Sequence, residues 1–232
     1  MVDARASDWQ ATAWRERERY ADGVARLGET RDADARQRQL TRIANAAYGA
    51  GLALLMQGRR DEAATWLRDS AKRYRESADG APPGSWGRPI GALKASLLAG
   101  DEDGAVAAAR WTLATAAPEA ESPIGRYAAA LASLVGGDDA QARLHADAIR
   151  TRDDFPRAVG DALAYLAARD VVGYAESVEE VLESFETREE YLEDVPVADT
   201  VLVLQLLAER RGITGAELSS PLLPRPPSSL RA

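Results

Sequence analysis

The 232-residue sequence contains no cysteine, so disulfides, thiolate metal sites and a cysteine nucleophile are excluded. Lysine is scarce, with only Lys72 and Lys94, and the remaining basic residues are arginine. Aromatic residues make up 6% of the chain, and His145 is the single histidine. One histidine without cysteine cannot anchor a typical zinc site. We therefore expect no metal, and no other cofactor.

Long apolar runs and a basic surface are also missing. The most apolar stretch, Val195 to Ala208, contains Asp199 and is too short to span a bilayer. The segment Met1 to Gln10 lacks the pattern of a signal peptide. The net charge of −8 disfavours a nucleic-acid binder, because phosphate contacts need a basic surface. We expect a soluble, cytoplasmic protein with no membrane or nucleic-acid partner, and these features leave its oligomeric state open.

Signatures of catalysis are scarce. The sequence has no G-x-S-x-G nucleophile elbow and no phosphate-binding G-x-x-x-x-G-K-[ST] motif. Acids such as Asp101, Asp138 and Asp153 stand in turns or at helix starts, where the helix dipole already favours them. We predict that the protein is not an enzyme. A carboxylate pair working in a groove is the remote catalytic alternative.

The chain is rich in alanine, leucine, arginine and glutamate, which are strong helix formers. Apolar residues recur at helical spacing, most clearly from Leu40 to Leu55, and no alternating β-branched run indicates a strand. We predict an all-α protein with an N-terminal helix in residues 1–30, a helical-repeat domain in 31–212 and a proline-rich, disordered tail in 213–232. The final helix, from about Val197 to Arg211, is expected to cap the stack.

Three predicted hairpin turns share one pattern, and a fourth is a degenerate copy. Each has apolar residues, a glycine, charged residues and then an alanine five positions after the glycine. A glycine can end a helix in the left-handed conformation, and a small alanine lets the second helix approach closely. The glycines are Gly58, Gly100 and Gly137; the alanines are Ala63, Ala105 and Ala142; and the fourth copy has Arg169 and Tyr174 in these places.

These turns resemble those of tetratricopeptide-type helical repeats. In the first unit Gly51 stands where that family has a small residue, and Leu67 fills the large apolar position that follows Ala63. The resemblance covers roughly residues 40–187, and the spacing between turns shortens along the chain. It implies a right-handed, α-solenoid-like stack of antiparallel hairpins that binds other proteins.

The layout of the C-terminal third resembles the immunity protein 49 family. An alanine- and leucine-rich helix is followed by the turn at Arg169 and Asp170, an acidic helix, an acidic linker and a final apolar helix that ends at Gly212. This resemblance implies a small helical protein that neutralises a polymorphic toxin.

The acids are concentrated in one segment. Residues 176–194 contain nine acids and one base, Arg188, so this segment accounts for the whole net charge. Five glutamates recur at helical spacing, while the apolar residues Val178, Val181 and Phe185 fall on the opposite side. We predict an exposed acidic face that binds a basic protein; adaptation to a salty medium is the alternative explanation. The five are Glu176, Glu179, Glu180, Glu183 and Glu186.

Two aromatic residues complete the candidate site. Trp86 stands in the proline- and glycine-rich loop from Ala81 to Arg88, where it is either an exposed interface anchor or packed back over the repeat. Tyr48 either lines a concave groove or belongs to the core. The sequence thus favours a non-catalytic protein-binding module, with toxin neutralisation as the alternative.

Overall fold

A computed structural model describes residues 8–115, 117–214 and 217–225, and within them it contains helices but no strand. The α-helices are α1 (Trp9–Glu29), α2 (Ala33–Met56), α3 (Arg60–Glu76), α4 (Gly87–Leu98), α5 (Glu102–Ala114), α6 (Pro123–Gly136), α7 (Asp139–Arg150), α8 (Arg157–Ala168), α9 (Val171–Glu186) and α10 (Asp199–Glu209). Short 3-10 turns lie at Ala117–Glu119 and Leu192–Asp194. The prediction of an all-α protein is confirmed.

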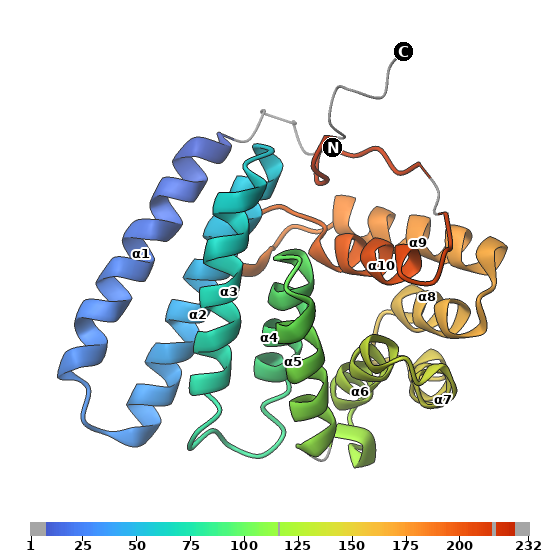
Figure 1. Cartoon of the computed structure of the whole chain (residues 1–232), viewed down its shortest axis with the longest axis horizontal. Coiled ribbons are helices and arrows are strands. Elements are labelled where there is room, and N and C mark those ends of the chain that lie inside the picture. The colour runs from blue at the N-terminus through green and yellow to red at the C-terminus, as the bar shows by residue number, and fades with distance from the viewer. Residues whose placement is uncertain (1–7, 116, 215–216, 226–232) are drawn as a thin grey trace.

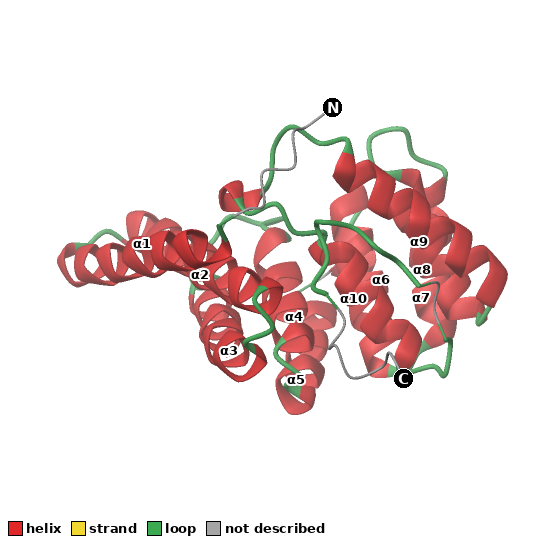
Figure 2. Ribbon diagram, turned by 90° about the horizontal axis from the view of Figure 1, so that it is seen from above, coloured by secondary structure: helices red, strands yellow, loops and turns green. Residues whose placement is uncertain are grey.

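Each helix from α1 to α9 packs against the next one in the chain (Figures 1 and 2). The pairs α2–α3, α4–α5, α6–α7 and α8–α9 are hairpins closed by tight turns. Ser7, whose spacing from Gln10 predicts that it caps the first helix, lies outside the described residues. In the structure the side chain of Asp8 caps α1 by accepting hydrogen bonds from the backbone N–H groups of Gln10 and Ala11.

The four hairpin turns share one geometry. The residue that ends the first helix has a left-handed backbone in all four, with φ of 75° at Gly58, 64° at Gly100, 78° at Gly137 and 55° at Arg169. The next residue donates its backbone N–H over 3.0 Å to the carbonyl five positions earlier, as in a Schellman motif. The side chains at the predicted alanine positions, and Tyr174 in the fourth copy, are fully buried.

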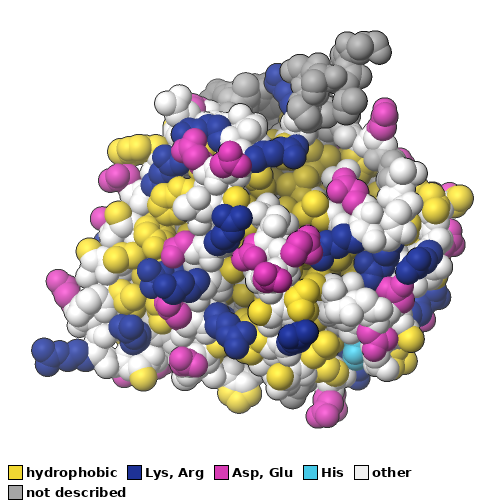
Figure 3. Space-filling model, in the orientation of Figure 1, with side chains coloured by type: hydrophobic (Ala, Val, Ile, Leu, Met, Phe, Trp, Pro, Cys, Tyr) yellow, Lys and Arg dark blue, Asp and Glu magenta, His cyan; other side chains and the backbone are white. Residues whose placement is uncertain are grey.

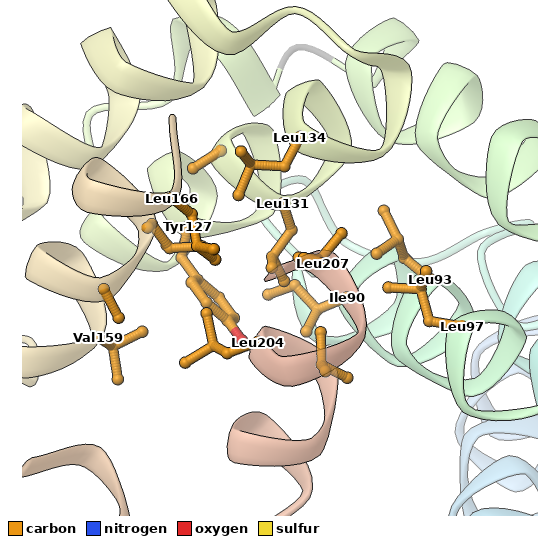
Figure 4. Packing of buried hydrophobic residues seen from close by; sticks show 14 of the residues in the cluster. Ile90, Leu93, Leu97, Tyr127, Leu131, Leu134, Val159, Leu166, Leu204 and Leu207 are labelled. Atoms are coloured by element: carbon orange, nitrogen blue, oxygen red, sulfur yellow. The ribbon is translucent and has the colours of Figure 1, made fainter. Parts of the chain in front are cut away.

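The last helix, α10, does not cap the end of the stack. It packs back against α4, α8 and α9, so it lies across the first helices of two separate hairpins (Figure 1). Leu204 and Leu207 are fully buried, and Figure 4 shows them among leucines and other apolar residues of α4, α6 and α8. The apolar sequence of α10 has this consequence because a helix with apolar residues on several sides needs neighbours on several sides.

The segment after α10 differs from the predicted disordered tail over its described part. The backbone N–H of Ala198 donates to the carbonyl oxygen of Leu222, and Leu223 is only 6% exposed within the main core. The two adjacent leucines gain enough from burial to hold this proline-rich stretch against the helices. The rest of the predicted tail, residues 226–232, lies outside the described residues.

In the part of the chain that the structure describes, every helix is too short or too polar to cross a membrane.

Candidate protein-binding surface and a buried polar cluster

The five glutamates predicted from the sequence form one exposed face of α9. We call Glu176, Glu179, Glu180, Glu183 and Glu186 the acidic face. The opposite side of the helix is core, since Val178, Val181 and Phe185 are at most 4% exposed. The predicted division of this helix into a solvated acidic side and a buried apolar side is therefore confirmed.

The described residues provide no ion-pair partner for the acidic face. No lysine or arginine nitrogen of the described residues lies within 4.0 Å of any of its five carboxylates. Elsewhere ion pairs are common, and Figure 3 shows acidic and basic side chains interspersed over the side of the molecule seen in Figure 1. Like charges one helical turn apart each cost a few tenths of a kcal/mol, roughly. The acidic face thus slightly destabilises its own helix.

Local sequence explains why α9 still forms. Asp170 caps its N-terminus by accepting a hydrogen bond of 3.0 Å from the backbone N–H of Gly173. The absent side chain of Gly173 leaves room for Tyr165, because a Cβ there would lie 2.6 Å from a carbon of that ring. Buried Tyr174 and Phe185 then anchor the two ends of the helix. The acidic face therefore belongs to a helix whose opposite, buried side holds it against the core.

The two aromatic candidates, Trp86 and Tyr48, are less exposed than the glutamates. Trp86 is partly buried and packs against the core, close enough to Gly125 that a Cβ there would lie 3.0 Å from its indole ring. Tyr48 is 3% exposed, and its hydroxyl donates a hydrogen bond of 2.8 Å to Asp199. Of the candidate site residues, only the five glutamates are exposed.

A polar cluster that was not predicted from the sequence lies between α2, α4 and α10. Lys94 and Asp199 form an ion pair of 2.6 Å, and their side chains are only 11% and 15% exposed. Lys94 also donates to the hydroxyl of Thr200 over 3.1 Å. Burial by itself lowers the pKa of Lys94, but the charge of Asp199, its hydrogen bond to Lys94 and the phenol of Tyr127 together raise this pKa above its ordinary value. The signal in the sequence is a charge of each sign in two mainly apolar helices, Lys94 in α4 and Asp199 in α10.

The segment that joins α9 to α10, residues 187–198, is held against α1 and α2. Arg19 pairs with the carboxylate of Glu193, and Asn45 donates to the same carboxylate over 3.0 Å. Glu193 and Asp194 have left-handed backbones, with φ of 56° and 55°. Such a conformation is rare for residues other than glycine and persists only where contacts enforce it. We call residues 187–198 the acidic link.

His145 is 3% exposed, and its Nδ1 lies 3.3 Å from a guanidinium nitrogen of Arg126. Burial and the charge of Arg126 lower the pKa of this imidazole. Among the described residues no three side chains of the metal-binding types gather into a group.

Among the described residues, two hollows lie near the elements discussed above. A shallow one of about 520 Å³ lies over the start of α1, beside Trp14 and Arg59. A smaller cavity of about 90 Å³ lies between α2, the acidic link and the start of α10, where Tyr48 and Asp199 form part of its wall.

Comparisons with models of known protein families, with curated proteins and with solved structures gave no match to this chain.

Proposed function

We propose that this protein is a non-catalytic binding module that recognises a basic surface of another protein through the acidic face of α9. One observation carries the proposal: five exposed glutamates on one helix face, none of them paired with a cation of the described residues. A partner that brings lysine or arginine to this face relieves repulsion that the free protein retains.

The electrostatics of such a surface favour fast and selective association. A region carrying charge of one sign raises the rate of encounter with the opposite charge, by roughly 10- to 1,000-fold in favourable cases. It also repels acidic proteins, so it contributes to the choice of partner more than to affinity. At 0.15 M salt this attraction is largely screened beyond about 8 Å, so the charges of the partner that approach closest to the helix contribute most.

We further propose that the hairpins form a right-handed, α-solenoid-like stack of the tetratricopeptide-like kind. The repeated turn at Gly58, Gly100, Gly137 and Arg169 supports this assignment. In such stacks the first helices of the hairpins line a concave surface that often binds ligands. Here α10 packs on α4 and α8, and this contact supports binding at the outer acidic helix in preference to the inner helices.

The narrower alternative is an immunity protein whose partner is a polymorphic toxin. The acidic face supports this alternative, because a toxin that acts on nucleic acid has a basic surface of its own. Co-expression with a toxin candidate tests this alternative. Protection of the cells that is lost when the acidic face is reversed would favour it, and protection that does not depend on the acidic face would count against it.

The direct experiment is affinity capture from the native host with two charge-matched variants. One carries Glu179→Lys, Glu180→Lys and Glu183→Lys. The control carries Glu18→Lys, Asp22→Lys and Glu29→Lys, three exposed acids on α1 whose reversal changes the net charge by the same amount.

The proposal expects a captured basic protein with the wild type and with the α1 control, and its loss with the acidic-face variant. If both variants retain it, the acidic face is not the binding surface. If both variants lose it, net charge and not this face determines binding.

A further inference from the structure

Arg188 is the one base among the nine acids of residues 176–194, yet it pairs with none of them. In the described chain no carboxylate oxygen lies within 4.0 Å of its guanidinium, although Glu189 and Glu190 follow it directly. Its Nε donates to the carbonyl oxygen of Ser184 over 3.2 Å, and its Nη2 reaches the hydroxyl of Ser184 at 3.5 Å. A guanidinium has five N–H donors, so the edge formed by the two Nη atoms retains donors without an acceptor.

The side chain of Arg188 is held in place at the wall of the 90 Å³ cavity. Its guanidinium carbon lies 3.7 Å from the centre of the Phe185 ring, and both residues line the cavity. Stacking on an aromatic ring fixes the plane of a guanidinium and leaves its edge available for hydrogen bonds. The donors are therefore positioned beside the cavity before any ligand arrives.

Asp199, an acid in the wall of the cavity, is already paired. The carboxylate of Asp199 accepts from Lys94 at 2.6 Å and from the hydroxyl of Tyr48 at 2.8 Å. Glu190 is an exposed residue, so its carboxylate is solvated. The remaining wall is mostly apolar and includes Leu52 and Val197. Arg188 and Glu190 are thus the two charges of this wall without an ion-pair partner among the described residues, and Arg188, the less exposed of the two, is the positive one.

We propose that Arg188 and this cavity bind a small organic carboxylate. The carboxylate accepts two parallel hydrogen bonds from the free edge of the guanidinium, and a short apolar body lies against Leu52 and Val197. Size narrows the class of acid, because an enclosed cavity that binds benzene measures roughly 150 Å³. At about 90 Å³ the cavity takes an acid the size of acetate or propionate.

Sodium acetate is the first probe, with sodium chloride at the same ionic strength and pH as the reference. Binding is followed through the ¹H–¹⁵N cross-peak of the Arg188 Nε–H group, which is assigned by its loss in Arg188→Gln. We expect a saturable shift with a dissociation constant on the order of 1 mM, and no saturation with chloride. In Arg188→Gln, followed through backbone amide cross-peaks, acetate binds about tenfold more weakly or not at all. In the control Arg152→Gln, which removes an exposed arginine paired with Asp154, acetate binds as in the wild type.

Two further probes test the cavity without any substitution. Propionate is expected to bind at least as well as acetate, and benzoate, whose ring exceeds the cavity, is expected not to bind. Methylguanidinium tests the opposite charge. The proposal is overturned if acetate gives no saturable shift, if it binds Arg188→Gln as tightly as the wild type, if benzoate binds as well as acetate, or if only the cation binds.

Discussion

The ammonium group of Lys94 on α4 lies 2.6 Å from the carboxylate of Asp199 on α10, in a part of the core where both side chains are nearly buried. This pair joins the first helix of the second hairpin to the last helix of the chain. Since Tyr48 of α2 also donates to Asp199, three helices meet at one carboxylate.

We expect Lys94→Met to destabilise the fold strongly, because it leaves the charge of Asp199 buried without its cation. Removing one member of a buried pair typically costs about 3–5 kcal/mol. The double variant Lys94→Met with Asp199→Leu removes both charges and should recover a large part of this loss. Urea unfolding measures each free energy. A cost below about 1 kcal/mol for Lys94→Met would show that the pair is solvated.

Substitutions at two equivalent positions of the left-handed turns are predicted to change the free energy of unfolding in opposite directions. Gly137→Ala adds a side chain at φ 78° and is expected to cost about 1 kcal/mol of unfolding free energy. Arg169→Gly relieves the same conformation and is expected to gain roughly 0.5–1 kcal/mol. The ion pair that Arg169 loses, 3.6 Å from Asp139, is largely exposed and contributes little. Thermal unfolding of both variants tests this prediction. Melting temperatures that shift in the same direction would contradict this account of the turns.

The close packing of helices at Gly51 can be tested by comparing its substitution with that of Gly28, which has free space around it. A Cβ at Gly51 would lie 2.6 Å from Leu67 and 3.4 Å from the backbone of Ala63, so Gly51→Ala is expected to cost about 1–3 kcal/mol. A Cβ at Gly28 in α1 would have no neighbouring atom within 4 Å, so Gly28→Ala is expected to stabilise by up to about 1 kcal/mol. Equal effects of the two substitutions in urea unfolding would mean that helix propensity alone decides them.

These turns and contacts also show what could be predicted from the sequence. The glycines and alanines of the hairpin turns are predictable because the end of one helix and the start of the next are determined by residues within one short segment. Exposure of the acidic face followed in the same way, from spacing within one helix.

Contacts between residues far apart in the chain could not be predicted from the sequence. The alternating charges near the start of α1 suggest a solvated face, but Glu16 is fully buried beside Gly49 of α2 and is paired with Arg15 and Arg19. Likewise, nothing within the sequence of α10 specifies that it packs on α4, since that contact depends on partners far away in the chain. The polar cluster and the cavity beside Arg188 arise from the same long-range packing.

Alkaline pH is expected to unfold the protein cooperatively. Burial raises the pKa of the phenols of Tyr48, Tyr74, Tyr127 and Tyr174 above the ordinary value of 10.0. Because their folded pKa values are raised, the stability linked to these protons is fully present below the unfolded value and is lost as the pH rises above it. The raised pKa of Lys94 acts in the same direction.

The check is a titration from pH 8 upward that follows tyrosinate absorbance and circular dichroism together. We expect part of the absorbance to appear only as helix signal is lost, above about pH 10. If all seven tyrosines ionise while the helix signal stays constant, the buried phenols are accessible to solvent.

The acidic face of α9 is the centre of the functional account, and the rate of association with the captured partner tests it most directly. At salt on the order of 0.05 M, where charges act over a longer range, we predict that the Glu179→Lys, Glu180→Lys, Glu183→Lys variant associates about tenfold or more slowly than the wild type. The α1 control with Glu18→Lys, Asp22→Lys and Glu29→Lys should stay within a factor of about three of the wild type. An association rate that is the same for the wild type and the acidic-face variant, with no dependence on salt, would contradict the account.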